Sequence, residues 1–228
     1  RAGCRRRREP QGGSRAERRQ VPGADASARG RILAVGPLAE VAAQTESLLT
    51  NANVADPNHE ADRAVTEPIR IDLPGRLLMP GFIDTHIHFP QVQVVASWGA
   101  QLLDWLNTYT FPEESRFAQQ GHAPQMAEHF LNLLLAHGTT TAVAFCSVHP
   151  QSTDALFSAA DRRNMAMIAG KVMMDRNAPP EVLDTPQQGY DDSKALIDRW
   201  HGTGRQRYAI TPRFAITSTP EQMETYSL

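Results

Sequence analysis

Cysteine is almost absent from this sequence, which contains only Cys4 and Cys146. Two cysteines cannot build a disulfide framework, so we expect a protein of the reducing cytoplasm. Their wide separation also excludes zinc sites built on a Cys-x-x-Cys pair. Any metal site in this chain would therefore have to be made from histidine and carboxylate ligands.

Long apolar runs and an excess of positive charge are missing as well. The formal net charge is -2, and no apolar stretch is long enough to span a bilayer. We therefore expect neither a membrane anchor nor a nucleic-acid partner. With 41% hydrophobic and 21% charged residues, the 228-residue chain suits one large globular domain, or one domain with a small satellite.

The first residues differ from the rest in being rich in arginine and free of apolar periodicity. Such a segment could be a targeting or nucleic-acid-binding arm. Its low complexity favours a disordered or non-native tail over residues 1–24. We assign it no function.

Residues 25–78 carry short strand-like patterns. Apolar residues alternate in GRILAVG and again in IRIDLPGRLLMPG, around a Pro-Gly turn. The polar stretch NANVADPNHEADRA between them is predicted to be a surface loop. Because these strands are too few to bury a core alone, we interpret residues 25–78 as part of a small β-domain.

From residue 79 to 228 the pattern changes to alternating strands and helices. The predicted strands are FIDTHIHF, TTTAVAFC, AMIAGKVMM and YAITPRFAI. The predicted helices cover residues 123–138, 153–164, 193–202 and 219–226, the first of them ending at Gly138. Regular alternation predicts a parallel sheet with covering helices. Four units fit either half of an eight-fold barrel or a small open sheet, and composition does not choose between them.

Two histidines near the end of the first strand could carry chemistry. His86 and His88 are two residues apart, so in a strand they share one face and could bind one metal ion. An isolated pair of this kind is more often incidental. This pair, however, opens a long irregular stretch, residues 89–114, of the sort that forms an active-site lid.

The motif PGFIDTHIH resembles the first-strand motif of the amidohydrolase superfamily, metal-dependent hydrolases built on a (β/α)8 barrel. More specifically, THIHFPQ, LLDWLNTYTFPEE, GKVMMDRNAP and ITPRFAITST are similar to the guanine deaminase family, over about Gly30 to Pro220. The resemblance implies an α/β fold: the first half of a TIM-type barrel with part of a small β-sandwich satellite. It also implies one zinc ion per site and hydrolytic deamination of guanine to xanthine and ammonia.

The same resemblance implies a role for five residues. His86 and His88 match zinc ligands, Gln91 matches a glutamine that hydrogen-bonds the purine, and Arg213 and Phe214 match a pair that holds guanine. The residue types suit these roles: an amide both donates and accepts, the arginine fork suits O6 and N7, and an aromatic ring packs on a flat base. Without the resemblance, Gln91 would be read as a loop residue, Arg213 as a surface ion pair and Phe214 as core.

Other candidates carry less weight. His149 could approach the site but is better read as a loop histidine, and His137 as a helix-end residue. Helix surfaces are the expected positions of His122, His129 and His201. Lys171 lies inside the third predicted strand, and the absence of a lysine from the fourth favours a one-metal site.

The family's later motifs do not occur before Leu228: a third metal-binding histidine, a proton-shuttling glutamate, a further histidine and a metal-binding aspartate. VPGADASA also lacks the apolar strand that the family places before GRI. We therefore expect an incomplete gene product of doubtful activity, with no catalytic residue of its own. Deamination of another heterocycle and an inactive binding or assembly fragment stay as alternatives, and a homodimer is an open expectation for the full-length protein.

Overall fold

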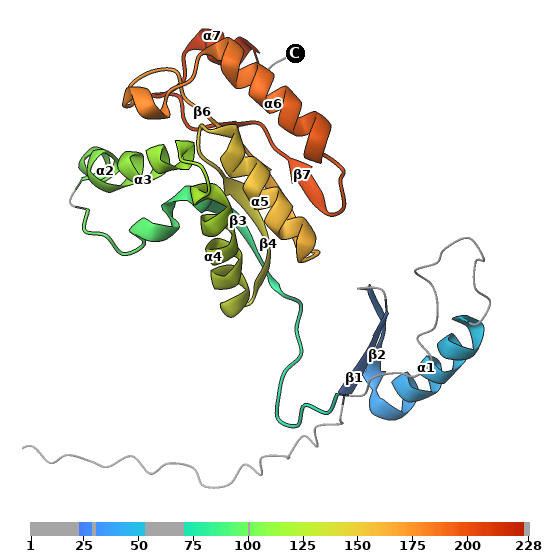
Figure 1. Cartoon of the computed structure of the whole chain (residues 1–228). Helices are drawn as coiled ribbons and strands as arrows, with labels where there is room; N and C mark the ends of the chain where they lie inside the picture. The colour runs from blue at the N-terminus through green and yellow to red at the C-terminus, as the bar shows by residue number, and fades with distance from the viewer. Residues whose placement is uncertain (1–22, 29–30, 53–70, 100, 226–228) are drawn as a thin grey trace, which may run out of the picture. The chain divides into compact units, whose positions relative to one another are not determined.

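The computed structural model describes residues 23–28, 31–52, 71–99 and 101–225 (Figure 1). The chain divides into two compact units, Arg1–Gly75 and Arg76–Leu228, which are described separately below. Within the described residues no helix is both long enough and apolar enough to cross a membrane.

The first unit contains an antiparallel hairpin and one helix. Strand β1 (Gly23–Ala28) pairs with β2 (Arg31–Pro37), and helix α1 (Leu38–Ala52) follows directly. VPGADASA was expected to lack an apolar strand; its described residues form the strand β1 although they include few apolar residues, because the backbone of β2 supplies a hydrogen-bonding partner. Helix α1 was not predicted either; its first two turns bury Val41.

The second predicted strand pattern of this region, IRIDLPGRLLMPG, does not form a strand over its described residues, 71–81. The chain turns at Gly75 (φ 69°), as the Pro-Gly pair predicts. No described strand pairs with this segment, and its apolar side chains Leu73, Leu77 and Leu78 are exposed. Of the predicted loop at residues 51–64, positions 51–52 end α1 and positions 53–64 lie outside the described residues.

The second unit is organised by a parallel sheet. Its strands are β3 (Phe82–His88), β4 (Thr139–Phe145), β5 (Ala166–Gly170) and β7 (Gln206–Tyr208), paired in that order. Beyond β5 and β7 the short strands β6 (Val172–Met173) and β8 (Thr211–Pro212) form a further parallel pair. Strands that follow chain order without a reversal are typical of a (β/α)8 barrel, whereas doubly wound sheets reverse at a switch point. The predicted α/β architecture is confirmed.

Long helices connect the strands as predicted. They are α4 (His122–Ala136), α5 (Pro150–Arg162) and α6 (Pro186–Trp200), and α7 (Pro220–Thr225) follows β8. Neighbouring helices α4, α5 and α6 pack side by side along the sheet (Figure 1). Gly138 stops α4 with φ 81°, a left-handed conformation that glycine adopts without strain.

The stretch after β3 was expected to be irregular and is mostly helical instead. Its short elements are η2 (Phe89–Val94), α2 (Leu102–Trp105), η3 (Leu106–Thr110), α3 (Phe111–Ser115) and η4 (Arg116–Ala118); a further turn, η5 (Pro180–Val182), precedes α6. Phe89 and Phe117 are fully buried, with ring centroids 5.2 Å apart. Burying these rings ties the stretch to the sheet.

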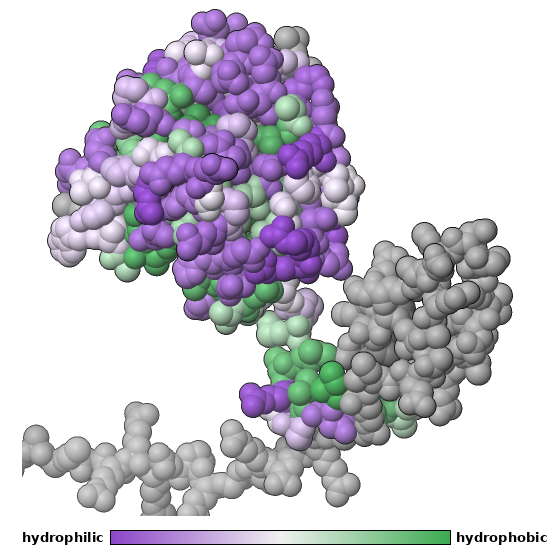
Figure 2. All heavy atoms as spheres, viewed as in Figure 1, coloured by the Kyte–Doolittle hydropathy of each residue, from purple (hydrophilic) through white to green (hydrophobic). Residues whose placement is uncertain are grey.

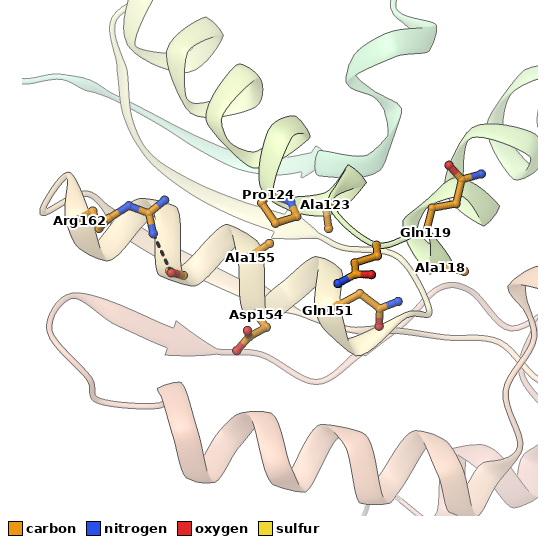
Figure 3. Close-up of a pocket in the computed structure, with 11 residues that line it drawn as sticks. Ala118, Gln119, Ala123, Pro124, Gln151, Asp154, Ala155 and Arg162 are labelled. Carbon is orange, nitrogen blue, oxygen red and sulfur yellow. Dashed lines mark hydrogen bonds between the residues drawn. The ribbon is translucent and has the colours of Figure 1, made fainter.

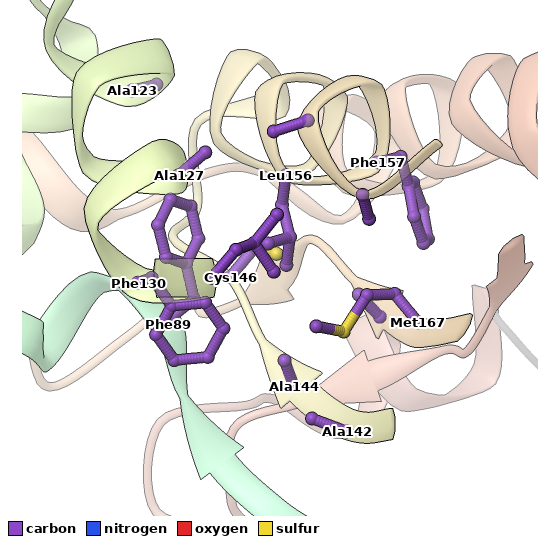
Figure 4. Packing of buried hydrophobic residues seen from close by; sticks show 14 of the residues in the cluster. Phe89, Ala123, Ala127, Phe130, Ala142, Ala144, Cys146, Leu156, Phe157 and Met167 are labelled. Carbon is purple, nitrogen blue, oxygen red and sulfur yellow. The ribbon is translucent and has the colours of Figure 1, made fainter. Parts of the chain in front are cut away.

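The main hydrophobic core fills the space between the sheet and the helices (Figure 4). Ala142 and Ala144 alternate along β4 and face Phe130 of α4 and Leu156 of α5 across this layer. Small side chains on the strand let the larger helix side chains interdigitate at close packing. Apolar residues also remain exposed near the start of β3, among them Phe82 and Ile83, on a surface that is otherwise largely hydrophilic in the view of Figure 2.

The core predicts a sharp difference between two leucine truncations. Leu156 is 0% exposed and Leu135 is 44% exposed. Leu156→Ala should lower the free energy of unfolding by about 2–5 kcal/mol, because a cavity forms where the side chain was removed. Leu135→Ala should change it by less than about 1 kcal/mol. Urea unfolding followed by circular dichroism measures both, and equal effects would contradict the packing described here.

Candidate active site

The site begins with the two histidines of β3. The ring centroids of His86 and His88 lie 5.4 Å apart, and both rings contact Phe145 at the end of the neighbouring strand β4. His88 stacks on Phe145 with ring planes 12° apart. The strand bulges between Asp84 and Ile87, where the Asp84 carboxylate accepts a hydrogen bond of 3.0 Å from the His86 backbone N–H. The two rings therefore lie on the same side of the sheet despite the irregular register.

His88 has the properties of a neutral ligand. Burial, together with the nearby positive charges of Arg213 and His86, lowers the pKa of His88 to about 4. At neutral pH the ring is uncharged, which is the form that binds a metal ion. Its Nδ1 atom is buried and has no hydrogen-bond partner among the described residues. An imidazole nitrogen in this condition is available for coordination.

Gln91 and Arg213, far apart in sequence, converge on one buried carboxylate. Glu114 of α3 is 1% exposed. Its Oε1 accepts a hydrogen bond of 3.3 Å from Gln91 Nε2, and its Oε2 accepts one of 2.5 Å from Arg213 Nη1. Arg213 also lies over the Phe111 ring, 5.4 Å from its centroid. Since Arg213 is close enough to His88 to act on its pKa, the structure brings Gln91, Arg213 and His88 into one region.

Phe214 belongs to the apolar wall next to this region. It packs against a second cluster of buried residues that includes Leu106, Phe111 and Val172. The side chain is only partly buried. It therefore retains an apolar surface that a flat ligand could cover.

The sequence of the second unit matches the model of a known protein family. The model of the amidohydrolase family matches residues 77–227, about two thirds of the chain. This chain belongs to the amidohydrolase family. The match starts just before β3 and so includes both histidines, Gln91 and Arg213.

Several relatives of this amidohydrolase are guanine deaminases. The Escherichia coli enzyme is 58% identical over 160 residues, covering 70% of this chain and 36% of that protein. The crystal structure of guanine deaminase from Bradyrhizobium japonicum is 39% identical with a TM-score of 0.72, covering 89% of this chain and 40% of the other. The C. acetobutylicum enzyme, described with guanine bound in its active site, is 31% identical with a TM-score of 0.61, over 64% and 35% of the two chains. The chain thus spans 35–40% of the length of these relatives.

The amidohydrolase histidines fit a metal ion as part of a larger ligand set. Two neighbouring imidazoles, one of them neutral with an orphaned nitrogen, are suitable zinc ligands. In the parts of the chain that the structure describes, no cluster of three or more histidine, cysteine or acidic side chains could hold a metal. A catalytic zinc with three protein ligands would need at least one from elsewhere.

Lys171 lies between β5 and β6 and is fully buried. Its Nζ forms an ion pair with the Asp184 carboxylate, which also accepts a hydrogen bond of 3.0 Å from Gln222 Nε2. Burial raises the pKa of Asp184, an effect that Lys171 opposes. Lys171 interrupts the predicted third strand, which the structure divides into β5 and β6.

One further histidine occupies a position that sequence alone did not indicate. His122 was expected on a helix surface, but it is 8% exposed and its Nε2 lies 3.3 Å from the Glu113 carboxylate. His149 lies in the loop before α5, as expected; it is half-buried, and burial lowers its pKa, with a smaller effect from Lys171. His129 and His201 are exposed, as expected.

A surface hollow of about 550 Å³ lies away from these groups, between the start of α4 and the side of α5 (Figure 3). Two of its polar side chains have partners within the protein: Arg162 donates to Ser158, and Gln151 donates to the Phe117 carbonyl. None of the five sequence-predicted site residues lines it.

Removing one partner of the buried Lys171–Asp184 ion pair should greatly lower the stability of the protein. Lys171→Met should lower the free energy of unfolding by about 3–5 kcal/mol, because it leaves the Asp184 carboxylate buried without its counter-charge. The double variant Lys171→Met/Asp184→Leu should recover most of this loss. Thermal unfolding measures both, with Lys194→Met of the exposed Lys194–Asp198 pair as a control that should stay near the parent. A double variant less stable than Lys171→Met would contradict this view of the pair.

Proposed function

We propose that the protein carrying this chain hydrolyses guanine to xanthine and ammonia at a site built around one zinc ion. The observation that carries the proposal is the convergence of Gln91 and Arg213 on Glu114 beside His88. Similarity to several guanine deaminases, one of them described with bound guanine, supports the same substrate.

In this proposal each residue has a task that suits its chemistry. His86 and His88 are two of the zinc ligands. A bound Zn²⁺ would supply Lewis-acid activation of the attacking water. Arg213 directs its remaining N–H groups to the acceptor atoms of guanine, and Gln91 hydrogen-bonds the same edge of the base. Phe214 covers the face of the ring.

Removing one histidine should remove the metal. In the protein that carries this sequence, His86→Ala or His88→Ala should weaken zinc binding by more than about 100-fold, since changes to groups behind a ligand already cost roughly 10–100-fold. His129→Ala, on the exposed face of α4, should leave zinc binding unchanged. Elemental analysis after dialysis against a competing chelator measures the metal content. Stoichiometric zinc in the His86→Ala/His88→Ala double variant would refute the assignment.

The next two variants should impair the turnover of guanine without changing the binding of zinc. Gln91→Ala and Arg213→Ala should each lower kcat/KM for guanine by roughly tenfold to a few hundredfold, because a polar group of the bound base loses its partner. Zinc content should stay at the parent value. Gln187→Ala and Arg205→Ala, both at exposed positions, are the matched controls. Ammonia release measures the rates, and unchanged kinetics in Gln91→Ala and Arg213→Ala would exclude guanine as the substrate held here.

A further inference from the structure

Glu114 is a buried acid to which neither the family resemblance nor the sequence patterns assign a role. It belongs to α3, in which Phe111 and Glu113 are also buried. Moving a carboxylate out of water costs several kcal/mol of free energy, unless charged or hydrogen-bonded partners compensate for the lost hydration. Gln91 and Arg213 are those partners, one at each carboxylate oxygen.

The position of Glu114 is fixed by the rest of α3. Phe111 packs in the second hydrophobic cluster. The neighbouring Glu113 accepts a hydrogen bond of 2.7 Å from Arg116 and lies 3.3 Å from His122. With its helix held in these ways, the Glu114 carboxylate is a fixed point to which the side chains of Gln91 and Arg213 must adjust.

A carboxylate determines which way the Gln91 amide faces. An ionised carboxylate only accepts hydrogen bonds, so the NH2 group of Gln91 must face Glu114. The Gln91 carbonyl oxygen is then directed elsewhere and is free to accept. Arg213 gives one of its five N–H donors to Glu114, and its guanidinium is further restrained over the Phe111 ring. The pair therefore offers one acceptor and several donors.

With Arg213 at the O6/N7 edge, as the proposed function places it, this pattern matches guanine and not adenine, because arginine only donates and adenine has a donating 6-amino group where guanine has O6. Guanine has acceptors at O6 and N7 and donors at N1 and the 2-amino group, whereas adenine has a donor at its 6-amino group and an acceptor at N1. We propose that Glu114 is a positioning residue that fixes the donor and acceptor pattern of Gln91 and Arg213, and so selects 6-oxopurines over 6-aminopurines. The inference rests on the proposed function, since it takes these two residues to contact the base.

The test compares Glu114→Gln, whose amide can donate as well as accept, with Glu128→Gln, which alters a partly exposed carboxylate paired with Arg162 and Arg163. The first readout needs no ligand. NMR of the arginine side chains should show a slowly exchanging Nη resonance that disappears in Arg213→Lys and is thereby assigned to Arg213. This resonance should be lost in Glu114→Gln and retained in Glu128→Gln.

The second readout is the binding of guanine and adenine, measured by equilibrium dialysis after the zinc has been removed with a chelator, so that guanine is not hydrolysed. Zinc content is measured before this removal. Glu114→Gln should weaken guanine binding by roughly 10–100-fold, the range expected when a buried hydrogen-bonded group loses its partner. The preference for guanine over adenine should fall by a similar factor, with zinc content unchanged. A purely structural role would lower stability without changing this preference.

Glu114→Asp keeps an acceptor-only group but shortens it by one methylene. Its effect in both readouts should lie between those of the parent and Glu114→Gln. If Glu114→Gln fails to fold, Glu114→Asp is used in its place. An unchanged Arg213 resonance together with an unchanged base preference, in whichever of the two variants folds, would overturn the inference. A parent protein that binds no guanine would instead contradict the proposed function, while loss of the Arg213 resonance in Glu114→Gln would still support the positioning role.

Discussion

Parallel pairing of consecutive strands is the constraint on which the site depends. Because β3, β4, β5 and β7 run in the same direction and in chain order, their carboxyl ends meet at one edge of the sheet. His88 ends β3, Phe145 ends β4, and Arg213 directly follows β8. Residues separated by more than a hundred positions in sequence come together because the strands do. The helices that connect the strands bury the main core against the sheet, and at this edge polar side chains lie beside the second apolar cluster.

Buried charge at this edge is organised into pairs. Glu114 pairs with Arg213, and Lys171 pairs with Asp184. Such pairs add little net stability, because desolvation offsets their attraction, but breaking one partner is costly. The effect of the first pair is to hold the long Arg213 side chain in a defined position beside His88. Binding sites need preorganised groups of this kind, since a side chain already held in place loses less entropy when a ligand binds.

Local sequence patterns predicted a good part of this architecture, and the reasons are specific. Alternation in FIDTHIHF and TTTAVAFC, and the apolar stripe of α4 ending at Gly138, are short-range signals that the structure confirms. The shared side of His86 and His88 follows from the same alternation. Helix α1 was missed because its residues were read as part of a strand-rich region, and the helices of residues 89–118 because their apolar contacts come from distant elements. No local pattern could identify Glu114, whose two partners are 23 and 99 residues away.

We propose that one edge of this sheet binds both zinc and guanine. A crystal structure of the zinc-loaded protein soaked with guanine tests it most directly. We expect metal density against His86 and His88, the base held between Gln91 and Arg213, and Phe214 against the face of the base. Metal bound away from both histidines, or guanine bound away from Gln91 and Arg213, would contradict it.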